Sequence, residues 1–179
     1  MDVEKTLQSL QEQIQDVTDS RKDKLSMVVF SGDLDKLLAA FIIATGAVAM
    51  GLEVVMFFTF WATPALRDKK KKGKGKDIFG KMFGFMLPKG PSQVTLSKMH
   101  MGGMGTAMMK KLMKKKSVSS LDELIELAGE LGVRIFICDM SMDLMGFSMD
   151  EVIDYPDLEN VGVATFLQEA SDSKIQLFI

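Results

Sequence analysis

Apolar and polar positions along the chain form two patterns: an amphipathic opening, then short apolar runs that alternate with segments of helical length. Five apolar residues in the opening recur at alternating spacings of four and three: Val3, Leu7, Leu10, Ile14 and Val17. That spacing places them on one stripe of a helix. We expect this helix either to dock on its own domain or to form a small oligomerising coiled coil. A charged linker is expected at residues 21–24.

From residue 25 the pattern predicts a single α/β domain that extends to residue 179. Runs rich in Val, Ile and Phe predict strands at residues 25–31, 53–60, 133–138, 161–163 and 174–179. Helices are predicted at residues 34–50, 105–116, 121–131, 141–145 and 164–170. Ser120 with Glu123, and Ser148 with Glu151, have the spacing of capping boxes. The alternation predicts an open, mostly parallel five-stranded sheet with helices on both faces.

Residues 61–116 form an insertion that breaks this alternation. The segment contains the run KKKKGKGK, and half of the sixteen methionines lie between Met82 and Met113. Fifteen lysines or arginines and two aspartates give residues 67–116 a net charge of +13, whereas the rest of the chain carries −15. Two interpretations remain open. The insertion is either a solvated basic loop followed by a helix whose methionines fill the core, or a mobile basic lid that contacts an anionic partner or membrane surface.

The chain has one cysteine and one histidine, which limits its chemistry. One cysteine forms neither an intramolecular disulfide nor a dithiol centre, and the pair cannot build a structural zinc site within one chain. We expect no metal and no cofactor. The polar opening MDVEKTLQ lacks a signal-peptide pattern, and Gly51 with Glu53 interrupts the apolar residues 37–61 before either half reaches the roughly 20 residues that span a bilayer. We expect a cytoplasmic protein.

The single cysteine, Cys138, lies where a predicted strand is followed at once by a predicted helical turn, in VRIFICDMSMDLMG. In open α/β sheets, ligands bind at the carboxyl ends of the strands. A helix N-terminus stabilises a thiolate, the nucleophilic form of cysteine, through its backbone N–H groups. Asp139 opposes this effect, so cations from the insertion or a neighbouring subunit would have to assist. The alternative role for Cys138 is that of a small buried residue ending a core strand.

Three segments resemble a known family: VVFSGDLDKLLAAFIIATGAVAMGLEVVMFFTFW, FGKMFGFMLPKGPSQVTLSKMHMGGMGTAMMKK and ICDMSMDLMGF. Together they resemble the DsrE/DsrF/DsrH-like family, most of all its branch with a Met- and Lys-rich insertion, from about Ser26 to Ile179. The resemblance implies a small Rossmann-like or flavodoxin-like sheet of the DsrE type and assembly into trimers or larger homo-oligomers. It also implies a role in sulfur trafficking beside rhodanese-type and TusA-type proteins.

By this resemblance, Cys138 matches the strand-end cysteine of the family, and Met140, Ser141 and Met142 belong to the turn that follows it. We expect a sulfur carrier or sulfurtransferase-like protein. Its Cys138 thiolate would accept sulfane sulfur as a persulfide or thiosulfonate and pass it to an acceptor thiol. Some relatives use additional cysteines, which this chain lacks, so any transfer here relies on one thiol.

Ser31, Gly32 and Asp33 follow the first predicted strand, and we expect them to line the same substrate pocket as Cys138. The reason is that the first and third strands can be neighbours at a switch point of the sheet. Nucleotide binding is not expected there. The loop has neither a G-x-G-x-x-G nor a GK[ST] motif, and Asp33 and Asp35 would repel phosphate.

A peripheral membrane or protein-interaction module is the alternative function, with the basic insertion as the working part and Cys138 structural. Nucleic acid is not an expected partner, because the basic run lacks interleaved tyrosines or arginines for stacking and base readout. His100, in KMHMGGMG, is expected as an exposed loop residue, although Met and His are also ligands of soft metals such as copper(I).

Overall fold

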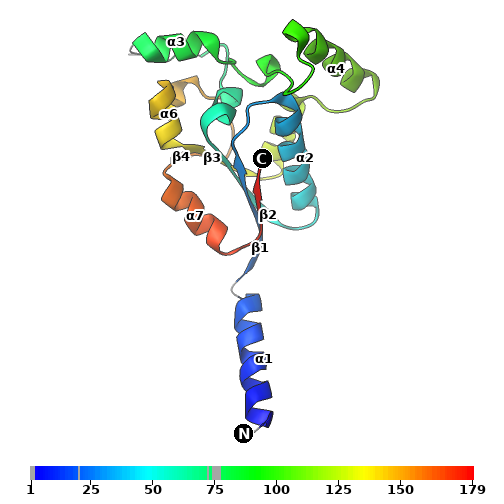
Figure 1. Ribbon diagram of the computed structural model, residues 1–179, viewed down its shortest axis with the longest axis vertical. Helices are drawn as coiled ribbons and strands as arrows, with labels where there is room; N and C mark the ends of the chain where they lie inside the picture. Colours follow the sequence, from blue (N-terminus) through cyan, green and yellow to red (C-terminus); the bar gives the residue numbers. More distant parts are fainter. Residues whose placement is uncertain (1–2, 20, 72, 74–77) are drawn as a thin grey trace.

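The structure, a computed structural model, describes residues 3–19, 21–71, 73 and 78–179. Its centre is a sheet whose described strands all run parallel, in the order β4-β3-β2-β1-β5 (Figure 1). The strands are β1 Lys22–Val29, β2 Glu53–Phe58, β3 Arg134–Cys138, β4 Leu158–Val161 and β5 Ser173–Phe178. The predicted five-stranded α/β fold is confirmed.

Helices cover both faces of the sheet, as the alternating pattern predicts. The described helices are α1 Val3–Asp19, α2 Leu34–Ala49, α3 Ile78–Met86, α4 Met104–Lys115, α5 Leu121–Glu130, α6 Asp139–Met145 and α7 Val163–Ser171. Of these, α2 and α5 lie on one face of the sheet and α7 lies on the other. Short 3-10 helices lie in the connections at Phe60–Leu66 (η1), Pro91–Gln93 (η2), Met101–Gly103 (η3) and Met149–Glu151 (η4). The Ser120 hydroxyl accepts from the Glu123 N–H, and the Glu123 carboxylate accepts from the Ser120 N–H, so the capping box of α5 is confirmed.

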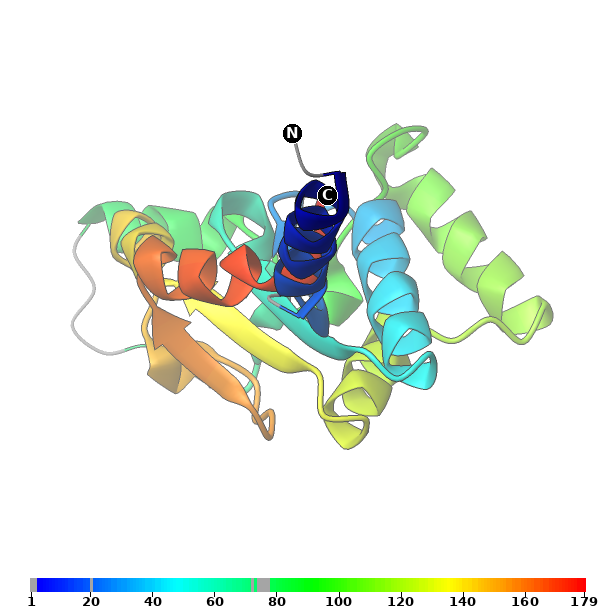
Figure 2. The ribbon, with the colours of Figure 1, turned by 90° about the horizontal axis from the view of Figure 1, so that it is seen from below.

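The core has two parts, one on each side of the sheet. The main core lies under α2 and α5, and a smaller one lies under α7, on the opposite side (Figure 2). Because successive side chains of a strand point to opposite faces, Ile135 and Ile137 of β3 enter the main core, whereas Phe136 and Cys138 enter the smaller one. The single cysteine therefore faces α7.

β1 begins at Lys22, so the prediction of a linker at residues 21–24 is wrong for most of its length. Lys24 is buried within this strand because its ammonium contacts the carboxylates of Glu169 at 2.7 Å and Asp172 at 3.1 Å. Paired in this way, a charged residue is tolerated in a buried strand. β4 occupies Leu158–Val161, earlier than the predicted residues 161–163, because α7 already begins at Val163.

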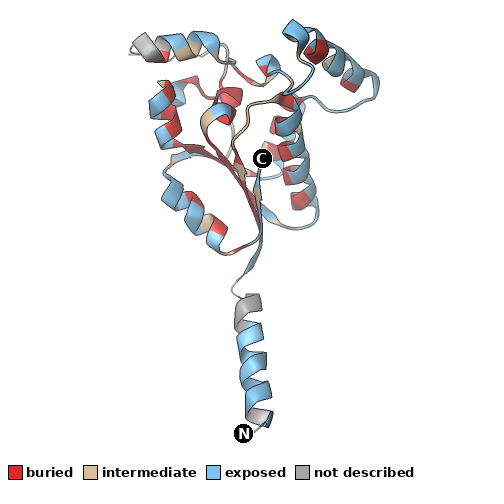
Figure 3. Ribbon diagram, viewed as in Figure 1, coloured by how far each residue is buried: buried red, intermediate tan, exposed pale blue. Residues whose placement is uncertain are grey.

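α1 extends away from the rest of the molecule, beyond the amino end of β1 (Figure 1). Its side chains from Thr6 to Gln15 are all exposed (Figure 3). The predicted helix is confirmed, but docking on its own domain is not what the structure shows.

The insertion is attached to the domain at several points. The Arg67 guanidinium forms a buried ion pair of 2.9 Å with Glu151 and donates to the Pro88 carbonyl at 3.2 Å. The Asp35 carboxylate accepts from both the backbone N–H and the hydroxyl of Ser97, at 2.8 and 2.6 Å. Residues 72 and 74–77 of the lysine-rich run lie outside the described residues. None of the described helices is both long and apolar enough to cross a bilayer.

Candidate functional site

The carboxyl edge of the sheet brings together the loops that follow β1, β2 and β3. β2 lies between β1 and β3, so the expectation that the first and third strands are neighbours is wrong. The chain connects β1 to β2 through residues 30–52 and β2 to β3 through residues 59–133, which contain the insertion, and each new strand is added beside the previous one. The β2 loop, residues 59–61, therefore separates Ser31–Asp33 from the Cys138 turn.

Cys138 is the last residue of β3 and the N-cap residue of α6. Its side chain is only 5% exposed and lies in the smaller core with Val55, Phe57, Phe136 and Phe166. The backbone N–H groups of the first turn of α6 lack intrahelical acceptors and point back toward the end where Cys138 lies. The predicted junction of a strand-end thiol with a helix N-terminus is therefore present.

Ser141 joins the Cys138 turn to the end of β2. Its hydroxyl shares a hydrogen bond of 2.8 Å with the Thr59 hydroxyl and accepts a second, of 3.0 Å, from the Phe60 N–H. Ser141 is fully buried and Thr59 nearly so. In this arrangement the Ser141 hydroxyl holds α6 against the β2 loop.

The neighbouring residues of the turn point in opposite directions. Met140 is 58% exposed, whereas Met142 is buried in the main core. Residues 141, 142 and 145 face inward because α6 begins directly at Asp139 and packs along the sheet edge. The Asp139 carboxylate accepts from the Asn160 side-chain amide at 2.9 Å, which links the turn to β4.

Ser31, Gly32 and Asp33 lie at the same edge, one loop away from Cys138. The Lys36 ammonium donates to the Ser31 hydroxyl at 3.0 Å and forms an ion pair of 3.1 Å with Asp33. A Cβ at Gly32 would lie 2.0 Å from the Trp61 carbonyl oxygen, so the β1 loop packs directly on the β2 loop. The three loops thus form one continuous layer of contacts.

Two cations, Lys24 and Arg134, lie near the amino ends of β1 and β3, whereas the thiol lies at the carboxyl end of β3. Arg134 donates two hydrogen bonds to Glu169, at 3.1 and 2.8 Å, and Lys24 donates to the same carboxylate. The bonds from Arg134, aided by Lys24, hold the pKa of Glu169 below its ordinary value. Burial alone would lower the pKa of Lys24, but its bonds to Glu169 and Asp172 outweigh this and raise it. This network joins β1, β3 and α7.

The insertion flanks the carboxyl edge on two sides. α3 packs on α6, with Gly80 so close to Gly146 that a Cβ at Gly146 would lie 2.5 Å from the Gly80 Cα. α4 lies on the other side, beyond α2 (Figure 1). A cavity of about 630 Å³ separates α4 from the start of α5 and is lined by Leu34, Lys110 and Met113 among others. Within the described chain, no residue of the insertion belongs to the apolar cluster around Cys138.

The sequence prediction missed the residues of the β2 loop. Residues 53–60 were expected as a continuous strand, but β2 ends at Phe58, and Phe60 adopts a left-handed backbone with φ 45°. Thr59, a polar residue at the end of an apolar run, and Pro64 shortly after it are the turn signals that could have indicated this. His100 is half-buried, with Nδ1 3.1 Å from the Thr106 hydroxyl.

Comparison with known proteins gives consistent matches over most of the chain. The model of the DsrE/DsrF/DrsH-like family matches residues 21–178. The uncharacterised protein YrkE of Bacillus subtilis strain 168 is 45% identical over 156 residues, which cover 87% of this chain and 96% of YrkE. The sulfur carrier protein DsrE2 of Allochromatium vinosum is 38% identical over 160 residues, which cover 87% of this chain and 98% of DsrE2.

The fold is also that of a solved structure, the YchN protein from E. coli. It superposes with a TM-score of 0.50 at 15% identity, over 87% of this chain and 98% of YchN. The sequence resemblance, the parallel sheet and the matched residues agree, and this chain belongs to the DsrE/DsrF/DrsH-like family.

Proposed function

We propose that this protein is a sulfur carrier and that Cys138 is the residue that holds the sulfur. The observation that carries the proposal is the position of the single thiol, at the carboxyl end of β3 and the N-cap of α6. The 38% identity to a protein named as a sulfur carrier supports the same class of function. Sulfurtransferase activity would use the same thiol, turned over repeatedly.

The chemistry needs only one thiolate. With thiosulfate as donor, the Cys138 sulfur attacks the outer, sulfane sulfur; the sulfur–sulfur bond of thiosulfate breaks and sulfite leaves with the bonding electrons. Cys138 then carries a persulfide. An acceptor thiolate attacks the terminal sulfur, forms its own persulfide, and releases the Cys138 thiolate. With tetrathionate, attack on a central sulfur instead leaves a thiosulfonate adduct and releases thiosulfate. No second cysteine takes part.

Access to the thiol is the main structural requirement of this chemistry. Cys138 is 5% exposed, and the corner between β4 and α7 lies beside it, because Val161 pairs with Cys138 and α7 starts two residues later. Val163 is 58% exposed at this corner. We infer that a local opening of this corner, an edge strand and a helix start, admits the donor.

Ser31, Gly32 and Asp33, together with Met140, remain part of the proposed substrate-binding edge. Met140 is exposed next to the thiol, and the Ser31–Asp33 loop contacts the same β2 loop that holds α6. Ser141 and Met142, which were predicted to bind substrate as well, face inward, and we propose that they act by positioning the turn.

A transfer experiment with a relocated thiol tests the carrier function. The wild-type protein, loaded with thiosulfate or polysulfide and freed of donor, should pass one sulfur per Cys138 to an added small thiol. The control is Cys138→Ser combined with Ser171→Cys, which places the thiol at an exposed position of α7. If the relocated thiol loads and transfers as well as Cys138, the position of Cys138 has no special role and the proposal fails.

The partners and the assembly state belong to the same proposal. We infer from the family resemblance that donors or acceptors are rhodanese-type or TusA-type proteins and that the protein forms trimers or larger homo-oligomers. Sedimentation of the purified chain measures the assembly directly. A monomer at micromolar concentration would contradict that part of the proposal and leave the chemistry of Cys138 unaffected.

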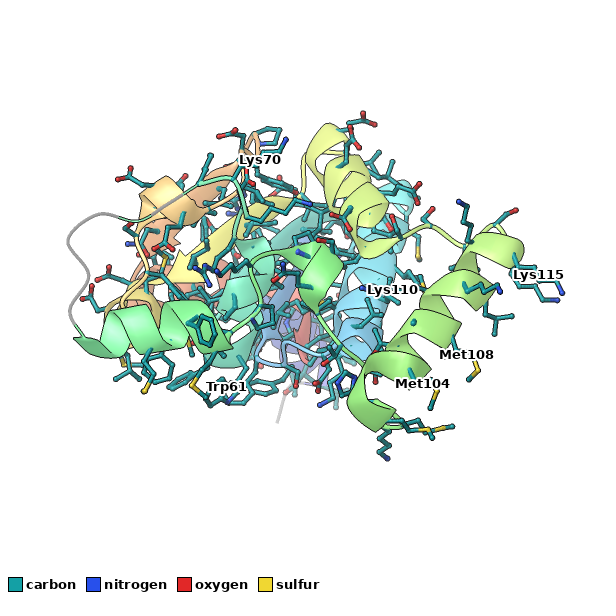
Figure 4. All side chains as sticks on the ribbon, turned by 90° about the horizontal axis from the view of Figure 1, so that it is seen from above. Trp61, Lys70, Met104, Met108, Lys110 and Lys115 are labelled. Atoms are coloured by element: carbon teal, nitrogen blue, oxygen red, sulfur yellow. The ribbon has the colours of Figure 1, made fainter. Side chains whose placement is uncertain are left out.

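Contact with a membrane surface is the second candidate function, and the exposed side chains of the insertion favour it. Phe85 is 83% exposed, Met86 70% and Trp61 50%. Figure 4 shows Met104 and Met108 pointing outward from α4, with Lys115 at its end and Lys70 on another side of the molecule. Exposed apolar side chains interleaved with lysines are the pattern of interfacial binding to anionic lipid.

Vesicle sedimentation tests this candidate. Phe85→Ser with Met86→Ser should reduce binding to anionic vesicles at least severalfold, while Ile42→Ser, an exposed apolar residue of α2, should leave it unchanged. Equal binding of all three proteins, or no binding by wild type, would contradict the membrane function.

A further inference from the structure

The apolar stripe of α1 is exposed to solvent along its described length. Val3 is 71% exposed, Leu7 55% and Leu10 49%, and Ile14 continues the stripe at 65%. These side chains lie on one face of the helix, because their spacing alternates between four and three. Most of the stability of a helix in a protein comes from packing of its apolar face rather than from its own helical propensity. The stripe therefore indicates a surface that another molecule covers.

The domain of the same chain is not that partner. α1 ends at Asp19 and β1 begins at Lys22, so two residues connect them. The helix continues outward from the amino end of β1, away from the sheet and its covering helices (Figure 1). Reaching the domain would require the helix to fold back through this short connection.

The spacing and charge of α1 indicate that the partner is another α1. The period of 3.5 residues is that of a coiled-coil seam, with Leu7 and Ile14 at a positions and Leu10 at a d position. The flanking e and g positions are Glu4, Thr6, Gln11, Gln13 and Thr18, of which four are uncharged. Two copies can therefore approach without a row of like charges between them.

The sequence of α1 argues against an anionic lipid surface as the partner. It contains four acidic residues and one lysine, the reverse of the charge that anionic lipid attracts. We propose that α1 is a self-association helix whose stripe packs against the stripe of α1 from a second copy of this chain. This contact is independent of the chemistry at Cys138.

Leu10 offers a test that does not depend on the orientation of the two helices. It is the central residue of the stripe, and in a parallel pair it faces its own counterpart, because d packs against d. In an antiparallel pair d packs against a, so Leu10→Cys is also mixed with Leu7→Cys in the same background. The test protein is full-length Leu10→Cys in a Cys138→Ser background, which has one thiol. The matched control is Gln8→Cys in the same background, on the opposite face of the helix.

Under mild oxidation, Leu10→Cys, alone or mixed with Leu7→Cys, should form about tenfold more disulfide-linked dimer than Gln8→Cys, because only residues of the seam face each other in the pair. Leu10→Asp should lower the average mass in sedimentation relative to wild type, whereas Gln8→Asp should not. Cross-linking of Leu10→Cys that equals that of Gln8→Cys, both alone and in the mixture with Leu7→Cys, would overturn the proposal. The proposal would also be overturned if Leu10→Cys formed cross-links only when mixed with a Met108→Cys variant. That result would mean that the stripe packs against α4 of another copy.

Discussion

Removing the Ser141 hydroxyl tests whether this residue holds the Cys138 turn in place. Ser141→Ala leaves the Phe60 N–H without its acceptor and the Thr59 hydroxyl without its partner, at bonds of 3.0 and 2.8 Å. Each buried polar group that loses its partner costs about 1–3 kcal/mol, and the Thr59 hydroxyl can turn partly toward another acceptor. We therefore expect the free energy of unfolding to fall by about 2–4 kcal/mol.

Urea denaturation at pH 7 measures this loss, and a double-mutant cycle assigns it. Thr59→Val removes the other hydroxyl with little change in volume. Because the two hydroxyls bond to each other, Ser141→Ala and Thr59→Val should be non-additive by about 1 kcal/mol. Asp143→Ala, an exposed position on the same helix, is the matched control and should change stability by less than about 0.5 kcal/mol.

The same variant links the contact to the proposed chemistry. If Ser141 positions α6, the folded Ser141→Ala protein should load sulfur on Cys138 more slowly than the Asp143→Ala control. A Ser141→Ala protein within about 0.5 kcal/mol of wild type, with an additive cycle, would refute a structural role for the hydroxyl.

Two further predictions concern the rest of the fold. Glu169→Gln should lower the free energy of unfolding by about 1–3 kcal/mol at pH 7, because it leaves Lys24 and Arg134 with less negative charge. The pKa of Glu169 is depressed in the folded state, so its contribution to stability is present above about pH 4.5 and disappears as the pH falls through the folded pKa. Denaturation curves of wild type and variant should therefore converge at acid pH. A difference that does not shrink at all as the pH is lowered, down to the pH at which wild type itself unfolds, would contradict this. Gly32→Ala should lower the free energy of unfolding by about 2–4 kcal/mol, because its Cβ would overlap the Trp61 carbonyl. Gly46→Ala, in open space within α2, should instead raise it by about 0.5–1 kcal/mol. Equal unfolding midpoints for the two variants would be inconsistent with the packing of the loops.

The fold could be predicted because its elements leave strong local patterns. The β-branched runs of β1, β2 and β3, the length of α2 and the Ser120 capping box are all visible within short windows of sequence. The start of β1 was missed because Lys24 is buried only through Glu169 and Asp172, which lie 145 and 148 residues away. No local window contains that information.

The site was predicted in part for the same reason. The strand-end position of Cys138 follows from β3 and α6, but both faces of a covered parallel sheet are apolar, so the pattern does not reveal which face the thiol enters. The role of Ser141 depends on Thr59, 82 residues earlier. The separation of Ser31–Asp33 from Cys138 depends on the strand order, which a run of similar parallel strands does not encode locally.

The central claim is that Cys138 carries sulfur, and mass spectrometry of the intact protein tests it most directly. After exposure to thiosulfate, tetrathionate or polysulfide and removal of excess donor, the wild-type protein should gain an adduct that peptide mapping places on Cys138 and that dithiothreitol removes. Cys138→Ser should gain none. Absence of an adduct on wild type with all three donors, or an undiminished adduct on Cys138→Ser, would contradict the account.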